Sequence, residues 1–308
     1  MRIIFMGTPE FSVPVLEALI DSRHEVVAVV TQPDKPKGRG KAMQFTPVKE
    51  TALANGIPVL QPQKVRVPEV VEQLRSYKPD LIAVVAFGQI LPKSILEMPK
   101  FGCVNVHASL LPKYRGAAPI QWAVINGEKE SGVTTMMMAR GIDTGDMLLK
   151  RSVELAEDET GDSLHDKLAA IGGPLLLETI DGLEQGTVAR IPQDESQSSH
   201  VGMLTKQMGK IDWTKPAVAL ERLIRGLNSW PSAYTSLNGK TVKIWSADVV
   251  EADEGQPGEV IAADKTKLVV KTGEQALSIR IIQPEGKKRM EIDAFLRGYE
   301  VKLHDRFE

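Results

Sequence analysis

The sequence predicts an α/β protein with two domains: a Rossmann-like N-terminal domain built on a parallel sheet and a small C-terminal OB-like β-barrel domain. The first half of the chain alternates short apolar runs with segments whose apolar residues recur at helical spacing. A polar stretch at 192–199 interrupts this alternation, and short β-rich runs separated by turns follow it. We therefore expect domains over 1–190 and 207–308, joined by a linker over 191–206.

In the N-terminal half, continuous apolar character marks the strands and periodicity marks the helices. Residues 2–6 form an apolar run that predicts a buried strand, and apolar residues recur at helical spacing over 11–22. The same criteria predict strands over 25–31, 57–60, 81–87 and 103–107, and helices over 47–55 and 68–77. Because these strands are apolar on both faces, we expect helices on both sides of the sheet. Ligands of such sheets bind at the carboxyl ends of the strands.

Beyond the polar stretch the pattern becomes mainly β. An amphipathic helix is predicted over 216–227. Short strands are predicted over 241–245, 259–262, 267–271 and 277–282. Turns such as Asn238-Gly239 separate these runs, and several short strands at this spacing are typical of a small barrel.

The composition excludes several classes of protein. The 308 residues carry a net charge of −2 with 42% hydrophobic and 25% charged residues, which is ordinary for a globular protein. The single cysteine, Cys103, excludes a disulfide framework and a cysteine-rich zinc site. The apolar stretch at 81–91 is too short to cross a bilayer, so we expect a cytoplasmic protein that binds neither membrane nor metal. The first turn, 7–10, lacks two glycines of the dinucleotide fingerprint, which argues against NAD binding.

The strongest candidate site lies at the end of the predicted strand 103–107. Side chains alternate along a strand, so Asn105 and His107 project from the same face. The sequence Leu-Leu-Pro at 110–112 ends the strand just beyond them, which places both polar groups at the carboxyl edge of the sheet. The alternative is a hydrogen-bonded structural pair in the core.

A glycine-flanked acidic turn at 141–146 is the second candidate. One of its carboxylates could reach His107 and orient the imidazole. An ordinary Asx turn is the alternative. Asp143 and Asp146 could also be metal ligands, but a cation needs more ligands than this segment offers.

Asparagine, histidine and aspartate together are suited to acyl transfer to an external nucleophile. The amide of Asn105 can donate a hydrogen bond to an oxyanion. His107 can shuttle a proton between the attacking and the leaving amine. This chemistry needs no nucleophilic serine or cysteine, and we interpret Cys103 as a small core residue.

An Asn-x-His and Ser-Leu-Leu-Pro pattern followed by a later aspartate resembles the folate-dependent formyltransferases, and the resemblance extends over essentially the whole chain. The segments that carry it are 102–112, 114–121, 132–134 and 141–146. Segments 6–11, 209–213 and 283–290 resemble, more narrowly, the members of the family that act on tRNA.

This resemblance implies a reaction and the residues that perform it. The formyl donor would be 10-formyltetrahydrofolate, released as tetrahydrofolate, and the acceptor would be the methionine α-amine of initiator Met-tRNA. By the same resemblance, the catalytic residues are Asn105, His107 and Asp143. Matching folate-binding residues are Ser109, Leu110, Leu111 and Pro112, together with Phe87, Gly88, Gln89, Ile90 and Leu91 of a loop that extends to Pro92.

Basic residues are the candidates for tRNA contacts. The loop 32–45 concentrates four cations between prolines and glycines, which argues against a stable helix. These cations are Lys35, Lys37, Arg39 and Lys41. Further candidates in the C-terminal domain are Lys206, Lys210, Lys243, Lys287, Lys288 and Arg289. For both groups the alternative is a solvated surface charge, which we expect for about half of the C-terminal candidates.

Two rival functions stay open from the sequence. The first is a formyltransferase for a small amine, such as glycinamide ribonucleotide or an amino-sugar nucleotide. The second is a non-catalytic RNA-binding protein on an α/β fold. The basic loop and the C-terminal domain argue against the first, and the three polar residues argue against the second. We expect a monomer that binds folate and tRNA.

Overall fold

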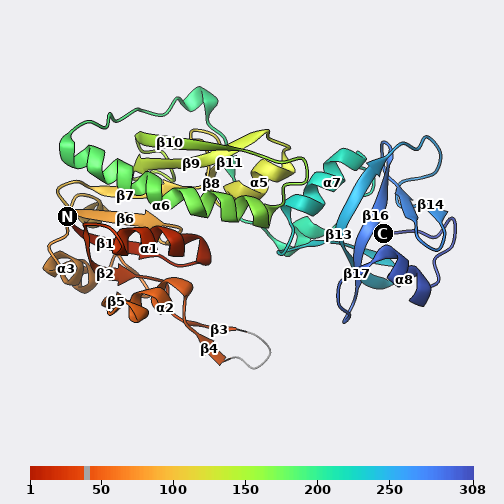
Figure 1. Cartoon of the computed structure of the whole chain (residues 1–308), viewed down its shortest axis with the longest axis horizontal. Coiled ribbons are helices and arrows are strands. Elements are labelled where there is room, and N and C mark those ends of the chain that lie inside the picture. Colours follow the sequence, from red (N-terminus) through yellow and green to blue (C-terminus); the bar gives the residue numbers. More distant parts are fainter. Residues whose placement is uncertain (38–41) are drawn as a thin grey trace. The chain divides into compact units, whose positions relative to one another are not determined.

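The computed structural model describes residues 1–37 and 42–308, which form two compact units (Figure 1). The first unit consists of Met1–Gly116, Ser131–Val153 and His165–Val201, and the second consists of Ala117–Glu130, Glu154–Leu164 and Gly202–Glu308. The units alternate along the chain, so no single cut separates them. The domain boundaries predicted at residues 190 and 206 stay predictions.

A seven-stranded sheet forms the centre of the first unit, with the strand order β10-β9-β7-β6-β1-β2-β5. Its strands are β1 (Arg2–Gly7), β2 (Glu25–Val30), β5 (Val59–Leu60), β6 (Leu81–Val85), β7 (Cys103–His107), β9 (Glu130–Met137) and β10 (Met147–Glu154). The five strands from β7 to β5 run parallel, which confirms the predicted Rossmann-like sheet. Strand β9 pairs antiparallel with β7. Its sequence could not reveal this direction, because buried strands of either direction are apolar on both faces.

Helices lie on both faces of this sheet (Figure 1). They are α1 (Val13–Ile20), α2 (Pro47–Ala54), α3 (Pro68–Ser76), α4 (Lys93–Leu96) and α6 (Gly161–Gln185), with the 3-10 turns η1 (Glu10–Ser12) and η2 (Glu195–Gln197). Proline opens α2 and α3, where a missing N–H leaves no hydrogen bond unmade. Thr46 caps α2, because its side chain accepts a hydrogen bond from the N–H of Lys49.

The two faces of the sheet are packed differently. On one face, α3 and α4 bury an apolar cluster that includes Ile82, Ile95 and Cys103. On the other face, Gly172 and Gly173 let α6 approach α1 and β7 closely. A methyl group at Gly172 would lie 3.4 Å from Cγ1 of Val106 on β7.

Two short sheets complete the first unit. Strands β3 (Lys35–Lys37) and β4 (Ala42–Gln44) pair as an antiparallel ribbon. Strands β8 (Arg115–Gly116) and β11 (His200–Val201) pair in parallel. Strand β11 directly follows the polar stretch at 192–199, and both belong to the first unit.

The second unit is an antiparallel sheet with helices. Its strands are β12 (Ala233–Leu237), β13 (Lys240–Val250), β14 (Val260–Ala263), β15 (Leu268–Lys271), β16 (Ala276–Pro284) and β17 (Met290–Glu291). Its helices are α5 (Pro119–Ile125), η3 (Lys206–Gly209), α7 (Ala217–Gly226) and α8 (Ile292–Gly298). The strand order is β12-β13-β16-β15-β14, with β17 beside β16. The predicted turn at Asn238-Gly239 joins β12 and β13 as a hairpin, and its two residues have φ values of 50° and 72°, as a tight hairpin turn requires.

Residues 305–308 connect the two edges of this sheet. Ser236 on β12 and Glu308 exchange two main-chain hydrogen bonds of 2.8 and 2.9 Å. Phe307 donates to the carbonyl of Gly258, beside β14, at 2.8 Å. Within the described chain, β12 and β14 form no direct ladder, so the OB-like sheet is bridged at its edges by this segment. None of the helices that the structure describes is both long and apolar enough to cross a bilayer.

Candidate functional site

Asn105 and His107 lie on β7, with side chains on the same face of the sheet. Val106 between them faces α6, whereas Cys103 faces α3 and α4. Alternation therefore places Asn105 and His107 on the Cys103 face, toward the carboxyl end of the strand. Both residues are largely buried, with exposed fractions of 9% and 7%.

The imidazole of His107 is held by a main-chain group. Its Nε2 lies 2.9 Å from the carbonyl oxygen of Tyr114. A carbonyl oxygen can only accept, so Nε2 carries the proton and donates. The neutral ring then has an unprotonated Nδ1, which lies 3.7 Å from Oδ2 of Asp143. That distance is too long for a hydrogen bond.

Asp143 approaches His107 from a turn that depends on glycine. Its Oδ2 accepts a hydrogen bond of 2.8 Å from the N–H of Gly116, 27 residues away in the sequence. The residue has a φ of 53°, a left-handed conformation that aspartate tolerates better than most residues. A methyl group at Gly145 would lie 1.7 Å from the carbonyl oxygen of Met137, so only glycine fits there. No group of three or more potential metal-ligating side chains occurs among the described residues.

The amide of Asn105 is available for a ligand. Among the described residues, none makes a hydrogen bond with the side chain of Asn105. Every fully buried polar side-chain atom there has a partner, so the amide atoms of Asn105 are not fully buried. A neutral amide with this freedom can donate to an oxygen that gains negative charge.

The predicted folate-binding residues at 109–112 follow β7 directly and are hydrogen-bonded to β9. Thr134 on β9 donates from Oγ1 to the carbonyl of Ser109 at 2.7 Å and accepts from the N–H of Leu111 at 3.1 Å. The Ser109 hydroxyl donates to the carbonyl of Lys113 at 2.7 Å. Leu111 is buried, and the Leu111–Pro112 peptide bond is cis. Leu110 is partly buried.

The second predicted folate-binding segment, 87–91, follows β6, the neighbour of β7. Phe87 and Leu91 are buried in the apolar cluster beneath α4. The Gln89 side chain accepts from the N–H of Val65 at 2.8 Å and donates to the carbonyl of Pro62 at 3.2 Å. Gly88 and Ile90 are exposed, so these two residues of the segment are directly accessible.

The predicted tRNA-binding residues belong to both units. Lys35 on β3 is exposed, and Lys37 ends the same strand. Arg39 and Lys41 lie outside the described residues. In the second unit, the exposed candidates are Lys206, Lys210, Lys287, Lys288 and Arg289.

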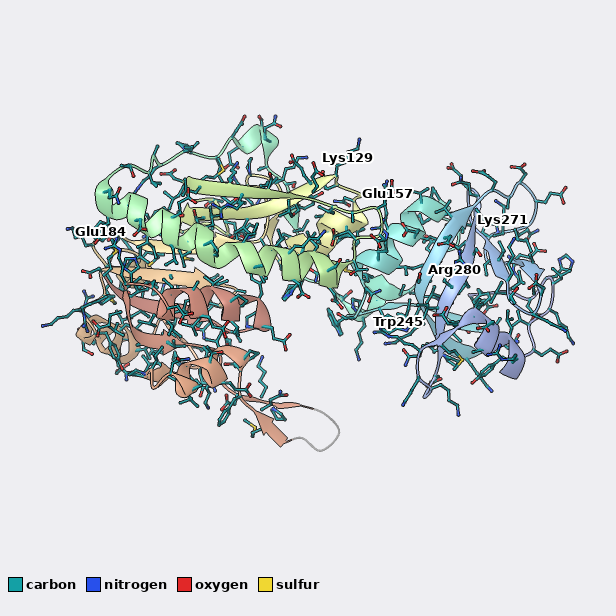
Figure 2. The ribbon with its side chains drawn as sticks, viewed as in Figure 1. Lys129, Glu157, Glu184, Trp245, Lys271 and Arg280 are labelled. Atoms are coloured by element: carbon teal, nitrogen blue, oxygen red, sulfur yellow. The ribbon has the colours of Figure 1, made fainter. Side chains whose placement is uncertain are left out.

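An aromatic side chain accompanies some of these cations. The Arg289 guanidinium lies over the ring of Trp245, with Cζ 3.2 Å from the ring centroid. Nζ of the partly buried Lys243 lies 5.5 Å from the same centroid. Trp245, labelled in Figure 2, lies on β13 and donates from its indole nitrogen to Oε1 of Gln283 at 2.9 Å.

Cys103 takes no part in this chemistry as a nucleophile. Burial raises the pKa of its thiol to about 12, so the thiolate is essentially absent at neutral pH. Its Sγ lies 3.5 Å from the carbonyl oxygen of Ile95 within the core.

Sequence reasoning missed the residues that support the site. Arg115 lies between the two residues whose main-chain groups contact His107 and Asp143, and its exposed fraction is only 1%. Arg115 lies in segment 114–121, which carries the family resemblance, but the resemblance assigned it no role. Gln193 and Glu195, which contact it, belong to the stretch interpreted as a linker. Their polar composition gave no signal of a structural role.

Comparisons with known proteins show which family the chain resembles. A family model described as "Formyl transferase" matches residues 1–180, and one described as "Formyl transferase, C-terminal domain" matches residues 203–300. The chain is 60% identical to the methionyl-tRNA formyltransferase of Agathobacter rectalis, over 98% of each chain. It is 54% identical to that of Lachnospira eligens, again over 98% of each.

Solved structures share the fold at lower identity. HypX from Aquifex aeolicus in complex with tetrahydrofolic acid is 20% identical with a TM-score of 0.64, covering 99% of this chain and 50% of that one. WlaRD, a sugar 3N-formyl transferase, is 20% identical with a TM-score of 0.66, covering 94% of this chain and 99% of that one.

Proposed function

The chain belongs to the formyl transferase family, and we propose that it transfers a formyl group from a folate-type donor to the α-amino group of methionine on initiator tRNA. The relatives that match nearly its full length are methionyl-tRNA formyltransferases. The observation that carries the proposal is the juxtaposition of a free amide, an oriented imidazole and a carboxylate beside the end of β7.

In the proposed mechanism, Asn105 stabilises the developing charge. The donor, 10-formyltetrahydrofolate, supplies an electrophilic formyl carbon and leaves as tetrahydrofolate. The Asn105 amide donates a hydrogen bond to the formyl oxygen as this oxygen gains negative charge during attack. Because the amide is neutral and does not titrate, it performs this role over a wide pH range.

His107 moves the proton. Nε2–H is committed to the carbonyl of Tyr114, so Nδ1 is the ring atom that accepts the proton from the attacking amine. The Asp143 carboxylate, 3.7 Å from that nitrogen, stabilises the imidazolium that forms. The amine nitrogen bonds to the formyl carbon, the bond from this carbon to the folate nitrogen breaks, and that nitrogen receives the proton.

The binding of donor and acceptor is part of the same proposal. Segments 109–112 and 87–91 would form the folate site, with Gly88 and Ile90 in direct contact because they are exposed. The basic residues of the β3–β4 ribbon and the second unit would contact the tRNA backbone. We include a cytoplasmic location in the proposal, and the monomeric state stays a prediction.

The decisive experiment compares Asn105→Ala with Asn55→Ala, a control at an exposed position after α2. Loss of an oxyanion donor typically lowers kcat by about 10²–10³-fold, so we expect that loss for Asn105→Ala alone. The assay measures transfer of labelled formyl from 10-formyltetrahydrofolate to charged initiator tRNA and charged elongator tRNA.

Two outcomes would refute the proposal. Undiminished turnover by a folded Asn105→Ala protein would remove the amide from the reaction. Formylation of small amines, with charged tRNA left unmodified, would assign the site to another acceptor of the same family.

A further inference from the structure

The polar segment at 192–199 is hydrogen-bonded to the main chain beside the candidate site. The N–H of Tyr114 donates to Oγ of Ser199 at 2.8 Å, and the N–H of Arg115 donates to the carbonyl of Ser199, also at 2.8 Å. Strands β8 and β11 continue this pairing. Residues 193–201 are therefore attached to the short stretch of main chain that contacts both His107 and Asp143.

Gln193 holds the Asp143 turn with both of its amide protons. Nε2 donates to the carbonyl of Asp143 at 2.7 Å and to the carbonyl of Gly145 at 2.8 Å. Its Oε1 accepts from Nε of Arg115 at 2.9 Å. The turn that Gln193 holds includes Asp143 itself, whose backbone has a φ of 53°, a left-handed conformation that is unfavourable for residues other than glycine.

Arg115 links this contact to the rest of the segment. Its guanidinium donates to both carboxylate oxygens of Glu195, at 2.8 and 3.0 Å. These hydrogen bonds hold the pKa of Glu195 below its usual range, so the carboxylate stays charged opposite the buried guanidinium. A planar two-point contact of this kind fixes orientation as well as position.

We infer that Gln193, fixed by Arg115, is a positioning residue that holds Asp143 beside Nδ1 of His107. The inference rests on the proposed function, because it assigns Gln193 a purpose in the same proton transfer. The carbonyl of Tyr114 accepts a hydrogen bond from the imidazole of His107, and the N–H of Gly116 donates to the carboxylate of Asp143. Gln193 links the Asp143 turn to this same stretch of chain through Arg115. Without the two hydrogen bonds from Gln193, the main chain of the Asp143 turn would be less restrained beside His107.

The test replaces Gln193 and a matched residue of the same segment. Gln193→Met keeps the approximate volume and removes all three hydrogen bonds. Gln197→Met is the control, because Gln197 is exposed on η2 and no hydrogen bond of its side chain is recorded among the described residues. A small misplacement of a catalytic group can cost up to about 10²-fold in rate, so we expect kcat to fall by about 10- to 100-fold in Gln193→Met. We expect KM values for tRNA and donor within about threefold of the wild type, because the substitution leaves the proposed binding residues in place.

A double-mutant cycle separates positioning from a general structural role. In an Asp143→Asn background, Gln193→Met should cause little further loss, since the group it positions is already disabled. If Gln193→Met unfolds, Gln193→Glu replaces it, because this variant keeps the acceptor for Arg115 and removes only the two donors to the turn.

Two results would overturn the inference: an unchanged kcat in a folded Gln193 variant, or a full additional loss in the Asp143→Asn background. Loss of activity in Asn105→Ala in the same assays would still support the proposed function. In that case, either of the two results would refute only the role of Gln193.

Discussion

At the scale of single residues, the most consequential contact is the one between His107 and a main-chain carbonyl. The hydrogen bond from Nε2 to Tyr114 selects the tautomer and directs Nδ1 toward Asp143. A side-chain partner could rotate or titrate, whereas a carbonyl can only accept. In the proposed mechanism, the position of the Tyr114 carbonyl therefore decides that Nδ1 of His107, and not Nε2, accepts the proton.

Cys103 supports a prediction about reactivity. The thiol is 1% exposed, and burial raises its pKa to about 12. Because the thiolate is the reactive form, we expect the native protein to resist iodoacetamide at pH 8.5, with labelling at least about 100-fold slower than for a free thiol. Mass spectrometry of quenched samples measures the extent of labelling.

The denatured protein is the control, and it should label completely under the same conditions. Since the folded-state pKa lies above the unfolded value, the stabilising contribution of the thiol is complete below about pH 8.5 and is lost as the pH rises toward 12. Equal labelling rates for native and denatured protein would show that this thiol is not buried.

At the scale of elements, the packing of α6 against α1 and β7 supports the strand that carries the site. This packing requires glycine at position 173. A methyl group at Gly173 would lie 2.6 Å from Cβ of Ala18 and 3.1 Å from the carbonyl oxygen of Pro14. Neither neighbour is the end of a flexible side chain, so a larger residue forces the helices apart.

We therefore expect Gly173→Ala to destabilise the first unit by about 1–3 kcal/mol, despite the higher helix propensity of alanine. Urea unfolding followed by circular dichroism measures the shift in midpoint. The control is Gly298→Ala at the end of α8, where a methyl group would meet no heavy atom within 4 Å. We expect that variant to be neutral or slightly stabilised. Equal stability of the two variants would contradict the close approach of α6 to α1.

At the scale of the whole molecule, the two compact units exchange segments of chain. Helix α5 precedes β9 in the sequence but packs in the second unit against α7. A methyl group at Gly226 on α7 would lie 2.5 Å from Cγ1 of Ile125 on α5, which shows how closely the two helices approach. The family model for the first domain therefore covers residues whose apolar partners lie beyond residue 201.

A fragment of residues 1–201 should consequently expose apolar surface and associate with itself. It keeps α5 but loses α7, the helix that approaches α5 at Ile125, which exposes this side of α5. We expect such a fragment to bind a hydrophobic dye and to associate in size-exclusion chromatography. Adding residues 202–308 in trans should reduce both effects. A monomeric fragment that binds no dye would contradict the packing, and point variants of the full chain are therefore the better test of function.

From the sequence we predicted the five parallel strands of the first sheet and the face on which Asn105 and His107 lie, but not helix α6 or strands β10 and β12. Each of these predictions depends on local periodicity, and the predicted bounds of β7 agree with the structure. The resemblance carried by short motifs also identified the family. The antiparallel direction of β9 and the bridging segment 305–308 were not predicted, because pairing direction and edge contacts leave no local pattern.

The assembly of the site depends on contacts between residues far apart in the sequence. Gly116 meets Asp143 across 27 residues, Gln193 meets Asp143 across 50, and Arg115 meets Gln193 across 78. The pairing of β8 with β11 brings residues 115–116 beside residues 200–201 and so joins distant parts of the chain at the site. A polar stretch has the same composition whether it is a solvated linker or a hydrogen-bonded support, because the two differ only in which partners the folded chain brings within reach.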